Sequence, residues 1–120
     1  MKRQQIWKPD RRDIIWIDFN PHVGTEMKDI HPMLVLSPKA FNEKNGLVIG
    51  LPMTTATFNE TNQFAVKTTW ANGAVSYILA SQPKSLDWRH RRASPHQLKK
   101  VSLDTFAQAC AKLNSIITLC

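Results

Sequence analysis

Residues 13–38 read DIIWIDFNPHVGTEMKDIHPMLVLSP, and this stretch decides how the chain folds. Residues 14–19 are rich in β-branched and aromatic side chains, which favour a strand, and Asn20-Pro21 ends it. The residues that follow, 20–32, form a polar loop, and the apolar run at residues 33–37 is typical of a second short strand. The stretch therefore predicts two strands connected by a long polar loop.

The rest of the chain alternates short apolar runs with turn signals, which is typical of a sheet of several strands. After Pro38 one helical turn is expected, and Asn45-Gly46 closes it. Further strands are predicted at residues 46–53, 64–67 and 75–80, and a final strand with one basic face at residues 84–93.

A helix is predicted near the C-terminal end, where Ser102 is suited to cap the first turn. Its apolar stripe is expected to pack on the sheet and consists of Leu103, Phe106, Cys110, Leu113 and Ile117. The fold class is therefore α+β, with a compact, partly closed β-sheet and a C-terminal helix packed on it.

The length of 120 residues fits one domain over residues 1–120, with residues 1–11 as a basic N-terminal arm. Sixteen Lys and Arg against nine Asp and Glu leave a net charge of +7, which favours a nucleic acid or an acidic protein as partner. No apolar run approaches the roughly 20 residues of a membrane span, and no signal-peptide core is present, so a cytoplasmic location is expected. Cys110 and Cys120 form no CxxC pair and have no nearby histidine cluster, so neither a zinc site nor a disulfide framework is indicated. No cofactor and no metal ion are expected.

The opening stretch, D-I-I-W-I-D-F-N-P-x-x-G-T-E followed after four residues by H-P-M-L-V-L-S-P, resembles the MazF/PemK family of toxin ribonucleases. The spacing agrees with the family pattern without a gap from Asp13 to Pro38. The tracts LPMTT at residues 51–55 and QPKSLDWR at residues 82–89 resemble two further family motifs. One position differs, because the family's arginine before the proline is His31 here. The resemblance implies a small SH3-like β-barrel with flanking helices that forms a homodimer.

The resemblance also implies an activity, which is metal-independent RNA cleavage through attack of a ribose 2′-hydroxyl on the adjacent phosphate. A proton must leave the hydroxyl, charge on the phosphoryl oxygens must be stabilised, and the leaving 5′-oxygen must be protonated. The family positions that share this work match His31, Thr54 and Glu26, which are therefore the candidate catalytic residues. The alternatives are that Thr54 caps a strand end and that Glu26 is a solvated loop charge.

His31 has two interpretations. Arginine grips a phosphate with a permanent charge and several donors, whereas histidine is mostly neutral at pH 7, so the replacement weakens or disables the site. Alternatively, the imidazole serves as a general base or acid, which a guanidinium does not do. Lys28 in the same loop is a candidate for the missing positive charge, and Asp29 would repel phosphate if it faced the groove.

The remaining candidates are RNA-binding residues. Gln82 is a candidate for reading a base edge, or else it is a buried amide bonded to backbone. The densest basic cluster, with Trp88 as a face for base stacking, consists of Lys84, Arg89, Arg91 and Arg92. The alternative is that Trp88 belongs to the core and the arginines form a solvated rim. The other histidines, His22, His90 and His96, are expected on the surface or in loops.

The resemblance thus implies a toxin endoribonuclease, an mRNA interferase, that cuts single-stranded mRNA at a short sequence and leaves a 2′,3′-cyclic phosphate. Its implied partners are single-stranded RNA, an acidic MazE-like antitoxin and a second copy of the chain. The alternative is a catalytically weakened or inactive MazF-like binding module, which holds antitoxin or RNA but has lost its chemistry through His31. Gyrase poisons share the fold, but the motifs match the ribonuclease branch.

Overall fold

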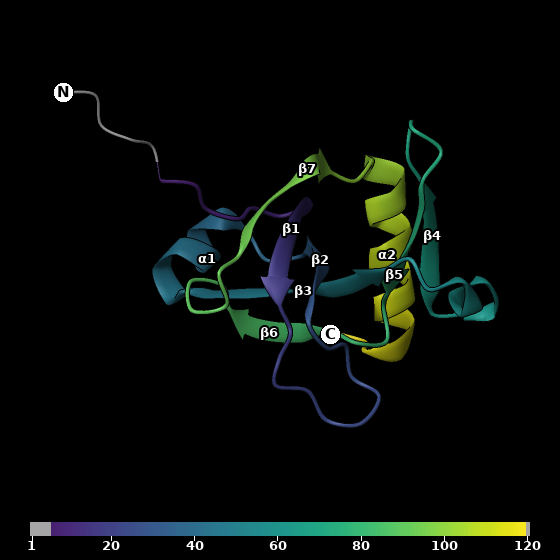
Figure 1. The fold of residues 1–120 in the computed structure, drawn as a ribbon, viewed down its shortest axis with the longest axis horizontal. Helices are drawn as coiled ribbons and strands as arrows, with labels where there is room; N and C mark the ends of the chain where they lie inside the picture. The colour runs from purple at the N-terminus through teal and green to yellow at the C-terminus, as the bar shows by residue number, and fades with distance from the viewer. Residues whose placement is uncertain (1–5, 120) are drawn as a thin grey trace.

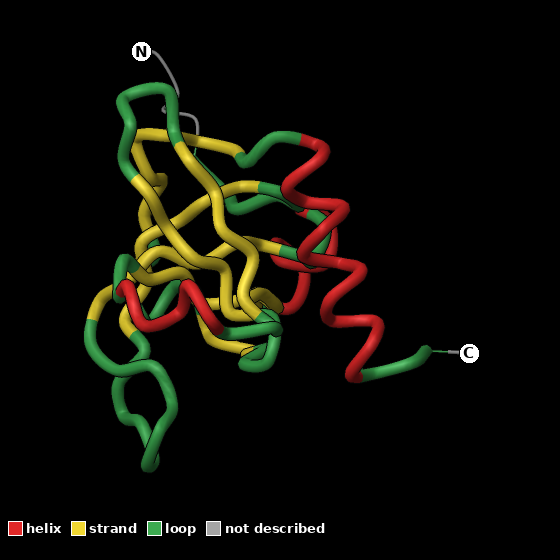
Figure 2. The backbone as a smooth tube through the Cα atoms, turned by 90° about the vertical axis from the view of Figure 1, so that its right-hand side faces the viewer, coloured by secondary structure: helices red, strands yellow, loops and turns green. Residues whose placement is uncertain are grey.

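The computed structural model describes residues 6–119, so the first part of the predicted basic arm at residues 1–11 lies outside the described residues, as does Cys120. Within the described range the chain runs β1–β2–α1–β3–η1–β4–β5–β6–β7–α2 (Figure 1). The strands form a curled antiparallel sheet in the order β4-β5-β3-β2-β1-β7, and β6 pairs with β3 outside this path. Figure 2 shows α2 lying along one side of the curled sheet. The predicted α+β class, a small barrel-like sheet with a C-terminal helix, is confirmed.

The two strands of the deciding stretch are β1 (Asp13–Asp18) and β2 (Ile30–Val35), which pair with each other antiparallel in continuous register. Both predicted strands are therefore confirmed. The loop predicted at residues 20–32 is wrong at its second boundary, because the pairing with β1 begins already at Ile30. As a consequence, His31 lies on a strand, where neighbouring strands fix its position, and not in the loop.

Strand β3 (Leu47–Thr54) pairs with three other strands, more than any other strand of the described sheet. One edge is covered by β2, and the other first by β6 (Lys84–Asp87) and then by β5 (Val75–Leu79). Gly50 is paired on both sides, and a Cβ added there would lie 2.3 Å from the carbonyl oxygen of Leu34 on β2. Only glycine therefore permits this approach of β2 to β3.

The sheet ends in β4 (Ala65–Thr69), which pairs with β5, and in β7 (Ser94–Lys100), which pairs with β1. The predicted strand at residues 84–93 is correct only for β6. After β6 the chain turns, and the Ala93 N–H donates to the Trp88 carbonyl oxygen at 2.9 Å. Strand β7 was not predicted because Pro95 lacks an N–H for the ladder, but an edge strand tolerates this.

The helical elements of the described chain are α1 (Lys39–Asn45), the 3₁₀ turn η1 (Thr57–Thr61) and α2 (Leu103–Ile116). The predicted cap of α2 is confirmed, because Ser102 Oγ accepts the Thr105 N–H at 3.1 Å. Over residues 6–119 no helix has the length and apolar character needed to cross a membrane.

The predicted apolar stripe of α2 is wrong at its first member, Leu103, and at its last, Ile117, which follows the helix as its C-cap and is 45% exposed. Phe106 and Leu113 pack on the core and Ala109 is fully buried, but Leu103 is 71% exposed. At about 100° per residue, Leu103 lies about 120° around the helix from Ala109 and therefore leaves the packed face. The helix covers the sheet through its middle and not through its first turn.

Two cores lie on the two faces of the sheet, as expected when side chains alternate along a strand. On β1, Ile14 points into the core beneath α2, whereas Ile15 and Ile17 point into the other core. The core beneath α2 also contains Leu34, Leu51, Met53, Val66, Ile78, Ala80, Val101 and Ala109. The other core also contains Phe19, Met33, Val35, Val48, Leu86 and Trp88.

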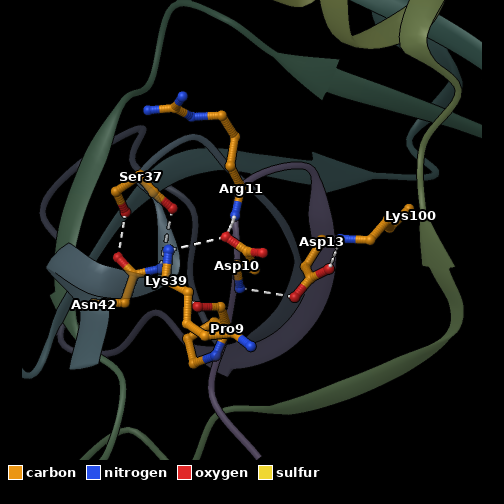
Figure 3. A network of polar contacts seen from close by, with 8 residues as sticks. All are labelled: Pro9, Asp10, Arg11, Asp13, Ser37, Lys39, Asn42 and Lys100. Atoms are coloured by element: carbon orange, nitrogen blue, oxygen red, sulfur yellow. Dashed lines mark hydrogen bonds and ion pairs between the residues drawn. The ribbon is translucent and has the colours of Figure 1, made fainter.

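The segment that leads into β1 is tied to α1 by buried and backbone hydrogen bonds (Figure 3). Asn42 is fully buried, and its Nδ2 donates to the carbonyl oxygens of Pro9 at 2.9 Å and Ser37 at 3.0 Å. Asp10 Oδ1 accepts the Lys39 N–H at 2.9 Å, and this bond is the main reason why the pKa of Asp10 is lowered. The described end of the predicted arm is therefore part of the packed structure.

Candidate active-site cavity

A cavity of about 380 Å³ is bordered by residues of β1, β2 and β7, the end of β3 and the turn between β4 and β5. Its lining includes His31 and Thr54, two of the three candidate catalytic residues; we call it the His31 cavity. His31 lies on β2 and Thr54 ends β3, and these two strands pair with each other from Met33 and Pro52 onward. The remaining lining residues are Ile14, Trp16, Ile30, Pro32, Met53, Thr55, Trp70, Asn72, Ala74, Val75, Ser76, His96, Gln97 and Leu98.

The lining of the His31 cavity is almost free of ionisable groups. The described residues that border the cavity include no lysine, arginine, aspartate or glutamate. The ionisable side chains among them are those of His31 and His96. Lys28, the candidate for the missing charge, is exposed in the loop and does not border the cavity. A positive charge supplied by the lining itself therefore has to be an imidazolium.

Thr54 is the last residue of β3 and is half-buried. Its Oγ1 accepts a hydrogen bond from the Ala56 N–H at 3.2 Å, which is the strand-end cap considered for it. Because the oxygen acts as acceptor in this bond, the hydroxyl hydrogen remains a donor for a substrate oxygen. The cap and a role in the site are compatible in this geometry.

His96 is a member of the site that the sequence did not identify. It was expected on the surface or in a loop, but it lies on β7, is only 8% exposed and borders the His31 cavity. Its ring stacks on Trp16 with centroids 4.7 Å apart, and its Nδ1 accepts the Leu98 N–H at 3.1 Å. The sequence signal for this strand was the alternation of His96 and Leu98 with exposed residues. The neighbouring Pro95 argued against a strand at this place.

The stability of the protein is expected to fall on mild acidification because of His96. Burial lowers the pKa of His96 below its ordinary value of 6.5, so the unfolded chain takes up this proton more readily than the native state. The contribution of neutral His96 to the free energy of unfolding is complete above about pH 6.5. It is lost as the pH falls through the lower pKa of His96 in the native state. Urea unfolding of the parent and of His96→Gln between pH 8 and pH 5 should show a weaker pH dependence in the variant. Parallel curves would contradict this assignment.

Glu26, the third candidate catalytic residue, borders a different cavity of about 390 Å³ together with Thr25, Ser81, Gln82, Pro83 and Lys84. It forms an ion pair with Lys84 and accepts the Val23 N–H at 2.8 Å. These two bonds, with that from Lys84 the stronger, lower the pKa of Glu26. Gln82 Oε1 accepts the Met27 N–H at 3.2 Å, as expected for an amide bonded to backbone. Glu26, Gln82 and Lys84 therefore hold the loop against β6.

The arginine cluster predicted at residues 89–92 is divided among separate contacts. Arg89 lies over the Trp88 ring at 4.8 Å and donates to the carbonyl oxygen of Glu43 at 3.2 Å. Arg91 Nη1 donates to the carbonyl oxygens of Asp18 at 2.9 Å and Asn20 at 2.6 Å. Trp88 is 6% exposed and belongs to the core, so it presents no open face for a base.

The base of the loop at residues 20–29 is closed by a reciprocal pair of side-chain bonds. Asn20 Nδ2 donates to Asp29 Oδ1 at 3.0 Å, and the Asp29 N–H donates to Asn20 Oδ1 at 3.1 Å. The Asp29 carboxylate, which would repel phosphate if it faced the groove, is thus engaged within the loop. Across residues 6–119 no group of three or more His, Cys, Asp or Glu side chains is arranged to hold a metal ion.

The fold and its motifs define the class of this protein: the chain belongs to the family of PemK-like, MazF-like toxins of type II toxin–antitoxin systems, whose model matches residues 10–117. It is 36% identical over 86 residues to the endoribonuclease toxin MazF of Escherichia coli K12, which covers 72% of this chain and 75% of that protein. The crystal structure of MazF from Deinococcus radiodurans is similar with a TM-score of 0.85 and 33% identity, covering 95% of this chain and all (100%) of that one. A chain of the Deinococcus radiodurans MazE–MazF crystal structure (Form-II) is similar with a TM-score of 0.79 and 30% identity, covering 96% of this chain and 100% of that one.

Proposed function

We propose that this chain is a toxin endoribonuclease that cuts single-stranded mRNA in the His31 cavity. The observation that carries the proposal is that His31 and Thr54, which are distant in sequence, border one cavity. The similarity to proteins named endoribonucleases supports the same activity. The proposal treats residues 1–120 as one toxin domain and places its action in the cytoplasm, where mRNA is found.

In the proposed reaction the ribose 2′-hydroxyl attacks the adjacent phosphorus, the bond to the 5′-oxygen breaks, and a 2′,3′-cyclic phosphate forms. His31 exchanges protons with the reacting oxygens, because an imidazole gives and takes a proton near neutral pH. Thr54 donates its hydroxyl hydrogen to a phosphoryl oxygen as charge develops there. These steps use only the side chains of this chain, so no metal ion is required.

The other predicted residues act around the cavity in this proposal. Glu26 is a positioning residue, because its ion pair with Lys84 and its bond from Val23 hold the loop. Arg91 holds the base of the same loop through two backbone carbonyl groups. Lys28, Gln82, Lys84 and Arg89 lie outside the cavity and are proposed to contact the RNA strand on either side of the cut, mainly through phosphates.

The proposed protein partners are an acidic antitoxin and a second copy of the chain. A net charge of +7 attracts an acidic segment as well as RNA. The structure named MazE–MazF from Deinococcus radiodurans contains a chain similar to this one, which supports an antitoxin partner. Exposed apolar residues near the end of α2, Ile116, Ile117 and Leu119, support the homodimer.

The proposal is tested by incubating the purified protein with a long single-stranded RNA in EDTA. Replacing Thr54 by valine removes one donor to the phosphoryl oxygens and is expected to slow cleavage by about 10²-fold. Thr69→Val is the matched control, since Thr69 is an exposed residue of β4 that does not border the cavity. Equal rates for the two variants would remove Thr54 from the mechanism, and an inactive parent would contradict the proposed activity.

A second candidate function is a binding module that holds RNA or antitoxin without cutting. It is favoured by one observation, the lack of lysine and arginine among the described residues that border the cavity. The two functions are separated by His31→Arg. If this variant cuts RNA and the parent does not, the present chain is a binding module; if the parent cuts, the chain is a ribonuclease that uses histidine.

A further inference from the structure

We propose that the His31 cavity, whose lining includes His96, Trp16 and Trp70, also holds a nucleobase of the RNA, to which His96 Nε2 donates a hydrogen bond. This inference rests on the proposed function and adds to it a residue that determines sequence preference. It concerns β7, the strand that neither the candidate residues nor the motifs identified.

The tautomer of His96 follows from its surroundings. Its Nδ1 accepts the Leu98 N–H at 3.1 Å, so Nδ1 carries a lone pair and the proton of the neutral ring is on Nε2. Protonation of Nδ1 would set two N–H groups against each other, and burial opposes the charged ring as well. The ring is also held by stacking on Trp16 at 4.7 Å. His96 is therefore a fixed, neutral N–H donor.

Within the described residues this donor has no hydrogen-bond partner, and its ring borders the cavity. A buried polar atom without a hydrogen bond would be cut off from any ligand. Among the described residues, the side-chain atom in this situation is Arg12 Nε, and not His96 Nε2. His96 Nε2 bonds to no other residue in the described range, yet it is not enclosed in this way. The space that the ring borders is the His31 cavity, so Nε2 remains available there for a ligand.

The chemistry around His96 fits a base, whereas His31 and Thr54 are the groups assigned to the phosphate in this cavity. No cationic lysine or arginine side chain is found among the described residues that border it, and His96 is neutral. Trp16 and Trp70 supply aromatic surface, and their indole N–H groups are bonded to Gln97 Oε1 at 3.4 Å and Ser76 Oγ at 3.3 Å. Aromatic side chains and a few directed polar groups are what single-stranded RNA recognition uses.

A fixed donor selects among bases. It accepts a base that places a carbonyl oxygen or an unprotonated ring nitrogen opposite Nε2, and it rejects one that places an amino group there. His31 and His96 border the same cavity, so a base held at His96 lies next to the nucleotide whose phosphate reaches His31. His96 is thus expected to determine the preference at a position adjoining the cut.

The test compares His96→Phe, which keeps an aromatic ring without a donor, with His96→Gln, which restores a neutral donor. His90→Phe is the matched control, because His90 is exposed and does not border the cavity. Cut sites are mapped on a pool of randomised single-stranded RNA, and kcat and KM are measured on the preferred substrate. Unfolding midpoints show that each variant is folded.

We expect His96→Phe to lose its preference at one position adjoining the cut and to fall about tenfold in kcat/KM on the preferred substrate. His96→Gln should recover most of this loss, and the pH profile of all variants should keep the parent's shape, since His96 exchanges no proton. An unchanged cut-site pattern in His96→Phe overturns the inference. The inference is also overturned if His96→Phe only weakens the binding of an acidic peptide, because that result would mark His96 as an antitoxin contact.

A binding measurement separates this inference from the proposed function. Uncleavable 2′-O-methyl oligonucleotides that differ in one base are titrated against the parent and His96→Phe. A base preference that is present in the parent and absent in His96→Phe supports the subsite even if the parent cuts no RNA. Equal base preferences of the two proteins overturn it, whatever the cleavage assay shows.

Discussion

Replacing His31 by alanine lowers the rate of RNA cleavage by about 10³-fold, within the range that a general acid or base contributes. The effect is expected to be large because the described lining of the cavity offers no lysine or arginine, and the other ionisable group, His96, is held as a neutral donor. His31 lies at a half-buried position on β2, so the loss should appear in kcat with little change in the free energy of unfolding. Initial rates on a defined RNA and urea unfolding measure the two quantities.

The matched control for this prediction is His22→Ala, which removes an exposed loop imidazole that does not border the His31 cavity. It should cut RNA at nearly the parent rate. A His31→Ala variant as active as His22→Ala would remove His31 from the reaction.

Replacing Gly50 by alanine destabilises the protein by about 3 kcal/mol, at the upper end of what overpacking costs. The added Cβ would lie 2.3 Å from Leu34 O and 2.9 Å from Met33 Cγ, so β2 and β3 have to separate. These strands carry His31 and Thr54, and the variant should therefore lose cleavage activity even at temperatures where it stays folded. Chemical unfolding and RNA cleavage measure the two effects.

Gly24→Ala is the control for Gly50→Ala. A Cβ at Gly24 meets no atom within 4 Å, but the φ of 57° is unfavourable for alanine, so a cost of only about 1 kcal/mol is expected. The comparison separates steric contact in the sheet from backbone strain in the loop. If Gly50→Ala costs no more than Gly24→Ala, the close approach of β2 and β3 does not limit the fold.

The fold was largely predictable because its signals are local. The β-branched run at residues 14–19, the apolar run at residues 33–37 and the Ser102 cap each report their own element, and all three are confirmed. Strand β7 escaped prediction because its evidence is not local. Pro95 argues against a central strand, and its position at the edge of the sheet becomes visible only when the other strands are placed.

The site was predictable in part, and for a different reason. His31 and Thr54 border one cavity because their strands pair, which no single stretch encodes, so the family resemblance supplied these residues. Sequence density was misleading for the arginines, since Arg89 donates to the carbonyl oxygen of Glu43, whereas Arg91 donates to carbonyl oxygens at the base of the loop at residues 20–29. His96 was missed because the sequence does not show whether a histidine is buried until the strand that contains it is known.

The central claim is that the chain cuts RNA through attack of the 2′-hydroxyl without a metal ion. It is tested most directly with two oligonucleotides that contain the mapped cut site, one all-ribose and one with a single 2′-deoxyribose at the cut nucleotide, incubated with the parent protein in EDTA. Mass spectrometry then identifies the product ends. We predict cleavage of the all-ribose strand to a 2′,3′-cyclic phosphate and a 5′-hydroxyl, with the deoxy-substituted strand intact at that position. Cleavage of both strands, or cleavage only after a divalent metal ion is added, would contradict the claim.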